Sequence, residues 1–181
     1  MFQTLYAEAM LASNKNNQSQ RSMSDNPIFE RAVRFISVLR HCQVLGMRVH
    51  SADTDGMTLV LPYSPHIVGH PQTGVIHGGA LTSLMDTACG IATLCVLPEF
   101  EVCPTLDLRI DYMHPAEPHK DVFGFAQCYR VTTDVMFIRG FAYQADPQQP
   151  IAHVVGTFMR MGKGAATGSK GLSGSINGGA L

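Results

Sequence analysis

The chain has 181 residues, of which 45% are hydrophobic and 15% are charged, and its formal net charge is -1 at pH 7. These values are ordinary for a globular protein and correspond to one domain, or to one domain with tails. The Lys and Arg residues are scattered and form no basic run interleaved with aromatic residues, so nucleic-acid binding is not expected. No apolar run reaches the roughly 18 residues of a membrane span, which argues against a membrane partner.

The five cysteines indicate a reducing compartment. They are Cys42, Cys89, Cys95, Cys103 and Cys128. Their number is odd and no pair has CxxC spacing, so neither a disulfide framework nor a zinc site is expected. Two of them, Cys89 and Cys95, lie in an apolar segment and are interpreted as core residues rather than nucleophiles.

Composition divides the chain into three parts. Residues 1–26 form a predicted flexible N-terminal arm, because residues 13–26 are rich in Ser, Asn and Gln. Residues 163–181 form a predicted flexible tail rich in Gly and Ser. The single folded domain is therefore expected over residues 27–162, which is long enough for one hydrophobic core.

The first half of this domain is predicted to contain one helix and two strands. Asn26 and Pro27 form a typical helix start, and apolar residues follow at helical spacing. Strands are expected at Gly46–Val49 and Met57–Leu61, on either side of a turn. The segment Ser64–Gly74 is expected to be a loop because it contains several Pro and Gly residues.

A long apolar helix and four strands are predicted for the rest of the domain. The helix runs from Gly78 to about Val96 and is ended by Pro98. The strand-like segments lie near Val102–Met113, Val122–Val131, Val135–Gln144 and Ile151–Met161. Successive strands with short turns indicate an antiparallel sheet, and a single long apolar helix requires a sheet curved around it. The predicted fold class is therefore α+β.

The main functional signal lies at the start of the long helix. Gly78 and Gly79 allow a ligand to approach the backbone closely, and the free N–H groups of a helix start can hold a negatively charged oxygen. A single carboxylate, Asp86, interrupts the apolar helix, and a buried acid is costly unless it has a role. These features together make an acyl-transfer site the first hypothesis.

Structural explanations compete with that hypothesis. The glycine pair could mark a close crossing of a helix and a strand, and Asp86 could be a buried carboxylate satisfied by a neighbouring hydroxyl such as that of Thr82, one turn earlier. His66 and His70 have the HxxxH spacing of some metal sites. The Pro and Gly residues around them exclude a helix, however, so a metal site is not expected.

Two motifs resemble those of hotdog-fold acyl-CoA thioesterases of the phenylacetic-acid-degradation type. The first is Gly74-x-x-His77-Gly78-Gly79, with an acid nine residues after the histidine, and the second is the segment Thr105–Ala116, which is similar to the family's strand ending in Tyr-Met-x-Pro-Ala. The resemblance covers roughly residues 44–161. It implies a long central helix wrapped by a curved antiparallel sheet, and hydrolysis of a thioester to free acid and CoA without a cofactor.

The resemblance also implies roles for the motif residues. The N–H of Gly78 would contact the thioester carbonyl, and the motif residue His77 that precedes it is also counted as a catalytic candidate. Asp86 would act as general base or nucleophile, and Thr105 would orient the acid or the water. Many members carry an Asn in the loop before the motif that contacts the carbonyl or the water, and this chain has His70 there, which makes His70 a further catalytic candidate. A histidine can donate a hydrogen bond in the same way, and it can also titrate near neutrality.

Geometry indicates that one subunit cannot complete this site. Gly78 and Asp86 are eight residues apart, which is about 12 Å along a helix, whereas groups acting on one carbonyl must lie about 3–3.5 Å from the reacting atoms. A two-fold dimer in which Gly78 of one subunit faces Asp86 of the other resolves this conflict. Strand alternation places Thr105 on the polar side with Asp107 and Arg109, so it contributes only if that edge lies at the subunit interface.

Substrate contacts are predicted from residue type alone. Gly79 at the helix start and neighbouring apolar residues are expected to contact the acyl group; the apolar residues are Val75, Ile76, Leu84 and Met85. Coenzyme A carries phosphates, so basic residues near strand ends are candidates for binding it. These are Arg109, Arg130, Arg139 and Lys120.

Two rival functions remain open. A non-catalytic acyl-CoA-binding or regulatory protein on the same scaffold would keep the glycine helix start and need no acid, so Asp86 argues against it. A hotdog dehydratase acting on hydroxyacyl thioesters would use a different Asp/His loop pattern, and the fold alone does not separate these activities. The preferred prediction is a cytoplasmic acyl-CoA thioesterase that forms a homodimer or a dimer of dimers.

Overall fold

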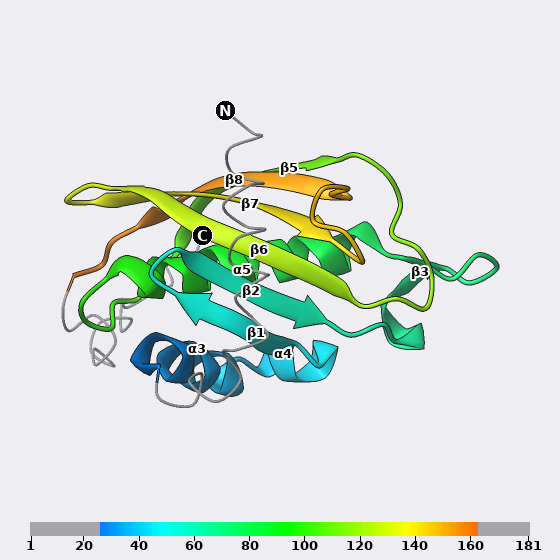
Figure 1. Ribbon diagram of the computed structural model, residues 1–181, viewed down its shortest axis with the longest axis horizontal. Helices are drawn as coiled ribbons and strands as arrows, with labels where there is room; N and C mark the ends of the chain where they lie inside the picture. The colour runs from blue at the N-terminus through cyan, green and yellow to red at the C-terminus, as the bar shows by residue number, and fades with distance from the viewer. Residues whose placement is uncertain (1–25, 163–181) are drawn as a thin grey trace, which may run out of the picture.

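One long helix packed inside a curved antiparallel sheet dominates the computed structural model (Figure 1), which describes residues 26–162. The helix is α5 (Gly78–Val96). The strands of the sheet are β1 (Arg48–Asp53), β2 (Gly56–Leu61), β5 (Thr105–Tyr112), β6 (Val122–Val131), β7 (Val135–Tyr143) and β8 (Ala152–Met159). They pair antiparallel in the order β1-β2-β6-β7-β8-β5. The α+β prediction of a long helix wrapped by an antiparallel sheet is confirmed.

Two helices precede the sheet and lie beside β1 (Figure 1). The first is α3 (Pro27–Val38), which begins as predicted: the Asn26 side chain accepts hydrogen bonds from the N–H groups of Ile28 and Phe29. The second, α4 (Arg40–Leu45), is not predicted. Apart from Asn26, the predicted arm and tail lie outside the described residues.

Most predicted strands are confirmed, but the first is largely wrong. Gly46 ends α4 with a left-handed φ of 68°, so the chain is still turning where the strand Gly46–Val49 is expected. β1 begins at Arg48, and the turn that follows it leads into β2 as predicted. The boundaries of β6 agree with the prediction. The strands β5, β7 and β8 lie within their predicted segments and are shorter than them.

The segment before α5 is more ordered than the predicted loop. It contains the short 3-10 helix η2 (Pro65–Ile67) and the strands β3 (Val68–His70) and β4 (Val75–Ile76). The two strands pair antiparallel and form a small hairpin that projects beyond the end of the main sheet (Figure 1). This hairpin delivers the chain into the first turn of α5, where the functional motif begins.

The sheet-facing side of α5 forms the centre of the hydrophobic core. Its buried residues include Leu81, Leu84, Met85 and Ala88, which pack against the inner face of the sheet. By length and composition alone α5 could cross a membrane, because an 18-residue window has a mean hydropathy of 1.4. The expectation that no run reaches that length is therefore wrong, although more than half of the window is buried in the protein, as in the core helix of a globular domain.

The close contact between β6 and β7 predicts a steric requirement for glycine at position 140. A Cβ atom there would lie 2.2 Å from the carbonyl oxygen of Phe125, which is backbone and cannot move aside. We expect Gly140→Ala to lower the free energy of unfolding by at least about 3 kcal/mol. In Gly90→Ala the new Cβ would lie 3.8 Å from the Phe158 ring, an ordinary contact, so this control should match or exceed wild type by up to about 1 kcal/mol. Urea denaturation measures both variants, and equal stabilities would contradict the prediction.

Candidate functional site

The first turn of α5 leaves one backbone donor without a partner. His77 is the N-cap residue, and its Nδ1 accepts a hydrogen bond from the Gly79 N–H at 2.9 Å. The Ala80 N–H donates to the His77 carbonyl at 2.9 Å. Among the described residues the Gly78 N–H donates no hydrogen bond. A free N–H at the positive end of a long helix is suited to hold an oxygen that gains negative charge.

His77, predicted as a catalytic residue, is placed as a cap. Because its Nδ1 accepts from Gly79, the neutral ring carries its proton on Nε2. The His77 N–H donates to the Ile67 carbonyl at 2.8 Å, and a Cβ on Gly69 would lie only 2.9 Å from the His77 Cα. These contacts hold the turn that presents Gly78. They also occupy the Gly79 N–H, so the substrate-binding role predicted for Gly79 does not have that donor available.

Asp86 lies about two turns further along α5 and is paired with Thr105. The Thr105 hydroxyl donates to Asp86 Oδ1 at 2.8 Å, and the Asp86 side chain is half-buried rather than fully enclosed. The Thr82 hydroxyl, the competing partner, contacts the Gly78 carbonyl at 3.1 Å and the Tyr112 hydroxyl at 2.7 Å instead. The hydroxyl that satisfies Asp86 is therefore that of Thr105 and not that of Thr82, and a purely structural role for the carboxylate stays an alternative.

A shift in strand register explains how Thr105 reaches the acid. Thr105 is paired with Phe158 and Asp107 with Thr157, so β5 contains one extra residue at Leu106. Such a bulge interrupts the alternation of side chains. Residues before it therefore point to the face opposite to the one that strict alternation, counted from the residues after it, would predict. Thr105 therefore shares a face with the buried Phe158 and points toward α5. The expectation that Thr105 lies on the polar side with Asp107 is wrong for this reason.

The side of α5 turned away from the sheet forms a polar strip. Gly79, Thr82, Ser83 and Asp86 follow one another at helical spacing, and all are exposed or half-buried. On one border of the strip, β5 contributes Thr105 and its neighbours. On the other border, α4 contributes a histidine described below. This strip, from Gly79 to Asp86, presents the acid on the open side of α5, and the free Gly78 N–H lies just before its start.

Ser83 and His41, which sequence reasoning missed, face each other across this border. Ser83 Oγ lies 3.1 Å from His41 Nε2, a distance typical of a nucleophile and its base. The Ser83 hydroxyl, however, donates to the Gly79 carbonyl at 3.0 Å, so it accepts its bond from His41. A serine whose proton is directed elsewhere is not activated by that histidine, and the pair links α4 to α5. No sequence motif marks it, because α4 itself has a weak pattern.

His70 lies at the end of the small hairpin. Its ring is exposed, and its Nδ1 is 2.9 Å from the Thr73 hydroxyl. Its carbonyl accepts hydrogen bonds from the N–H groups of Thr73 and Gly74 and so closes the turn. A catalytic role for His70 stays a prediction. Within residues 26–162, no group of three or more His, Cys, Asp or Glu side chains lies close enough together to hold a metal ion.

The apolar residues predicted to contact the acyl group do not share one environment. Ile76, Leu84 and Met85 are buried in the core, and a Cβ on Gly124 of β6 would contact Leu84 and Met85 at 3.0 Å. Val75 is half-buried in β4. In a single chain Leu84 and Met85 therefore pack the space between α5 and the sheet, and the role of all four residues in substrate binding stays a prediction.

The three predicted arginines project from the face of the sheet that lies away from α5. Arg109 and Arg139 are both paired with Val155, one from each side, and Arg130 is paired with Phe137. Arg109 forms an ion pair with Asp111 at 3.0 Å. Lys120 likewise pairs with Glu117. Within one chain the sheet separates the arginines from the Gly79–Asp86 strip, so their contact with a phosphate also stays a prediction.

The Arg139 guanidinium has the most constrained surroundings of these cations. It lies 5.4 Å from the centre of the Tyr129 ring, and its Nη2 donates to Gln127 at 3.2 Å. Its Nε is buried with no hydrogen-bond partner among the described residues. These contacts fix the side chain along the outer surface of the sheet.

The thiols in α5 are unsuited to nucleophilic chemistry. Cys89 and Cys95 are buried, which confirms their interpretation as core residues. Burial raises the pKa of Cys95 to about 12 and raises the pKa of Cys89 above the ordinary thiol range, with the Asp86 charge adding to the rise at Cys89. Neither thiol is therefore ionised near neutral pH.

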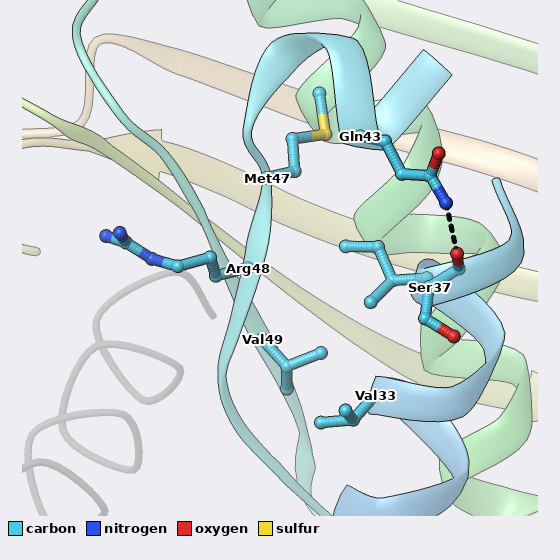
Figure 2. A pocket seen from close by; sticks show the side chains of 7 residues that line it. Val33, Ser37, Gln43, Met47, Arg48 and Val49 are labelled. Atoms are coloured by element: carbon cyan, nitrogen blue, oxygen red, sulfur yellow. Dashed lines mark hydrogen bonds between the residues drawn. The ribbon is translucent and has the colours of Figure 1, made fainter. Parts of the chain in front are cut away.

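A cavity of about 330 Å³ lies between α3, α4 and β1, away from these residues. Figure 2 shows Val33 of α3 facing Val49 of β1, with Met47 above them and Arg48 pointing away. The Arg48 guanidinium lies 3.9 Å from Asp121. The lining includes none of the predicted site residues, so this cavity is separate from the Gly79–Asp86 strip.

Comparison with known proteins identifies the family. The pattern of the Thioesterase superfamily matches residues 73–151, which include Gly78, Asp86 and Thr105. A crystal structure of a protein from Pseudomonas aeruginosa is 73% identical, covers 75% of this chain and 100% of its own, and superposes with a TM-score of 0.70. A protein from Halobacterium salinarum, whose name describes it as a candidate esterase, is 35% identical over 94 residues, or 50% of this chain and 61% of its own length. This chain thus spans less than two thirds of that relative.

More distant structures share the fold. The E. coli PaaI protein from the phenylacetic acid degradation operon superposes with a TM-score of 0.65 at 19% identity, over 75% of this chain and 94% of its own. A hypothetical thioesterase from Streptococcus pneumoniae, solved with coenzyme A, superposes with a TM-score of 0.56 at 13% identity, over 64% and 89%. The sequence-based expectation of a thioester hydrolase agrees with the matched family. The chain therefore belongs to the thioesterase superfamily and has its hotdog fold.

Proposed function

We propose that the chain hydrolyses an acyl-CoA thioester to a free acid and CoA. The observation that carries this proposal is the pair of groups on the open side of α5: the unpaired N–H of Gly78 and the carboxylate of Asp86 held by Thr105. The coenzyme A bound to the Streptococcus pneumoniae structure supports CoA as the carrier of the acyl group. All five cysteines, which lie within the described residues, are free, and this supports a reducing cytoplasm as the place of action.

Each group has a separate chemical task. The thioester carbonyl accepts the Gly78 N–H, so the oxygen is stabilised as it becomes an oxyanion. Asp86 takes a proton from water, whose oxygen attacks the carbonyl carbon, and the C–S bond then breaks to release CoA as a thiolate that recovers the proton. In the alternative route Asp86 Oδ attacks the carbonyl carbon directly, CoA leaves, and water hydrolyses the resulting anhydride.

The two groups must come from different subunits. Both lie on the regular helix α5, so eight residues separate them by about 12 Å, too far for one reacting carbon. β5 is an edge strand with one unpaired side, and the exposed apolar residues Leu106, Tyr112 and Met113 lie along or just after it. A second copy paired along β5 would bring its own polar strip beside the first. We propose a two-fold dimer with two equivalent sites.

Release of CoA thiol tests the activity. The protein is incubated with acyl-CoA esters of different chain length and ring content, and free thiol is measured with a chromogenic thiol reagent. Concentration-dependent thiol release by the purified protein supports hydrolysis. Tight binding of acyl-CoA with no thiol release favours the non-catalytic acyl-CoA-binding alternative and would overturn the proposal.

Mixed dimers test the shared site. A subunit with Gly78→Pro lacks the donor and one with Asp86→Asn lacks the base, so each homodimer is expected to be inactive. A mixed dimer holds one site with both intact groups, because the donor comes from the Asp86→Asn subunit and the acid from the Gly78→Pro subunit. With random assembly half of the dimers are mixed, so we expect about a quarter of wild-type activity in the mixture. Co-expression with two affinity tags isolates the mixed dimer. No recovery of activity would place both groups of a site in one chain.

A further inference from the structure

The strand β5 contacts α5 at two points that carry the proposed chemistry. Thr105, at its start, donates to Asp86, and Tyr112, at its end, donates to the Gly78 carbonyl at 2.8 Å. The two residues are seven positions apart, so strict alternation would place them on opposite faces. The extra residue at Leu106 turns both toward α5. One strand therefore holds both the acid and the first turn of the helix.

The hydroxyl of Tyr112 is the centre of a compact hydrogen-bond network. It lies 2.8 Å from the Gly78 carbonyl oxygen and 2.7 Å from the Thr82 hydroxyl, which lies 3.1 Å from the same carbonyl. The two hydroxyls have one proton each, so two of these three contacts are donated hydrogen bonds at any moment. A Cβ atom on Gly78 would lie 3.4 Å from the Tyr112 hydroxyl, so the phenol is in contact distance of this turn. Both side chains thus act on the backbone of Gly78.

Glycine at this position needs such support. It has no side chain to restrict φ and ψ, and the first residue of a helix makes few hydrogen bonds of its own. The direction of the free Gly78 N–H depends on those two torsions and on the orientation of the first turn. An oxyanion donor has to be held in place before the reaction, because reorientation during the reaction weakens the stabilisation.

We propose that Tyr112 is a positioning residue that holds the first turn of α5, so that the Gly78 N–H points toward the substrate carbonyl. The inference rests on the proposed function of Gly78 and extends it to a residue outside the Gly78–Asp86 helix. Thr82 assists because its single hydroxyl proton is shared between the Gly78 carbonyl and the Tyr112 hydroxyl, both within hydrogen-bond distance. β5 acts as a brace at two points, with Thr105 at one and Tyr112 at the other.

Tyr112→Phe tests this role by removing a single hydroxyl. We expect kcat to fall about 10-fold to 100-fold, the range for a displacement of up to about 1 Å, while KM changes by less than about twofold. Tyr129→Phe is the matched control, because the two tyrosines are equally exposed at 50% and Tyr129 lies on the sheet face away from α5. The control should keep kcat and KM. An unchanged kcat in Tyr112→Phe would overturn the proposal.

A double-mutant cycle separates positioning from a general loss of stability. If Tyr112 and Thr82 act through one network, Thr82→Val alone should lower kcat about as much as Tyr112→Phe does. The double variant should then lower kcat no further, instead of showing the product of the two single losses. Thermal unfolding of each variant identifies any loss of folded protein. Multiplicative losses in kcat, together with a rise in KM, would indicate independent structural effects and overturn the proposal.

The backbone amide of Gly78 gives a measurement that does not depend on activity. In protein labelled with 15N-glycine, its NMR signal is assigned by its loss in Gly78→Ala. We expect Tyr112→Phe to shift this signal, because the first turn that carries the amide is no longer held, and Tyr129→Phe to leave it unchanged. An unmoved signal would overturn the inference even if the enzyme is active. If wild-type protein hydrolyses no thioester, the proposed function fails, and the amide signal still decides whether Tyr112 holds the turn.

Discussion

Asp86→Asn is expected to lower kcat for thioester hydrolysis by about 1000-fold. Asparagine has nearly the same shape, and its Oδ1 can accept the 2.8 Å hydrogen bond that Thr105 donates to Asp86. The side chain is half-buried, so removing its charge leaves no unpaired buried group. The amide can neither take a proton from water nor attack a carbonyl. Fold and acyl-CoA affinity should therefore persist while turnover is lost.

A matched control and two binding measurements complete this test. Asp107→Asn makes the same chemical change on the opposite face of β5, at an exposed position, and should leave kcat unchanged. Calorimetric titration with a non-hydrolysable acyl-CoA thioether should give similar affinities for wild type and Asp86→Asn. Hydrolysis by Asp86→Asn at close to the wild-type rate would remove Asp86 from the mechanism. If the wild-type protein binds the thioether but releases no thiol from acyl-CoA, the non-catalytic alternative is identified instead.

Gly78→Pro should lower kcat by about 100-fold to 1000-fold, because it removes the single donor proposed for the oxyanion. Proline is favoured at the first position of a helix, where its missing N–H breaks no helical hydrogen bond. The preceding residue, His77, already has the extended conformation that proline requires, with φ of -64° and ψ of 133°. The helix should therefore form in the variant, and the N–H alone is lost.

Gly78→Ala is the control for the added side chain. Its Cβ would lie 3.4 Å from the Tyr112 hydroxyl, an ordinary contact, and its N–H is retained. We expect kcat of Gly78→Ala to exceed that of Gly78→Pro by at least about 10-fold, with circular dichroism and thermal unfolding confirming that both are folded. Equal losses in the two variants would show that bulk at this position, rather than the N–H, decides activity.

The sequence predicts long and strongly patterned elements well and short ones poorly. α5 agrees with its predicted bounds because a glycine pair opens it and an apolar run continues to Pro98. α4 is missed because its six residues give too short a window for a helical period. The β3–β4 hairpin is missed because Pro and Gly residues dominate its sequence, and such residues indicate a loop in the absence of tertiary contacts.

The site shows the same division in more detail. The Asp86–Thr105 pair follows from the family resemblance, yet alternation along the strand predicts the wrong face for Thr105. The bulge at Leu106 that corrects the face has no signature in the sequence, since it depends on how β5 pairs with β8. Tyr112 appears in a recognisable motif, but its bond to the Gly78 carbonyl joins residues 34 positions apart and cannot be read from local spacing.

The amino-acid sequence by itself determined the family, the central helix with its glycine start, and the acid eight residues after Gly78. Each of these follows from a local pattern of residue types. Only the tertiary structure decided which N–H of the first turn stays free and which side chains of β5 reach the helix. Those choices depend on the His77 cap and on the pairing register of an edge strand. The cap depends on the side-chain conformation of His77 and the register on contacts between β5 and β8, which are distant in the chain, and neither is visible in residue type alone.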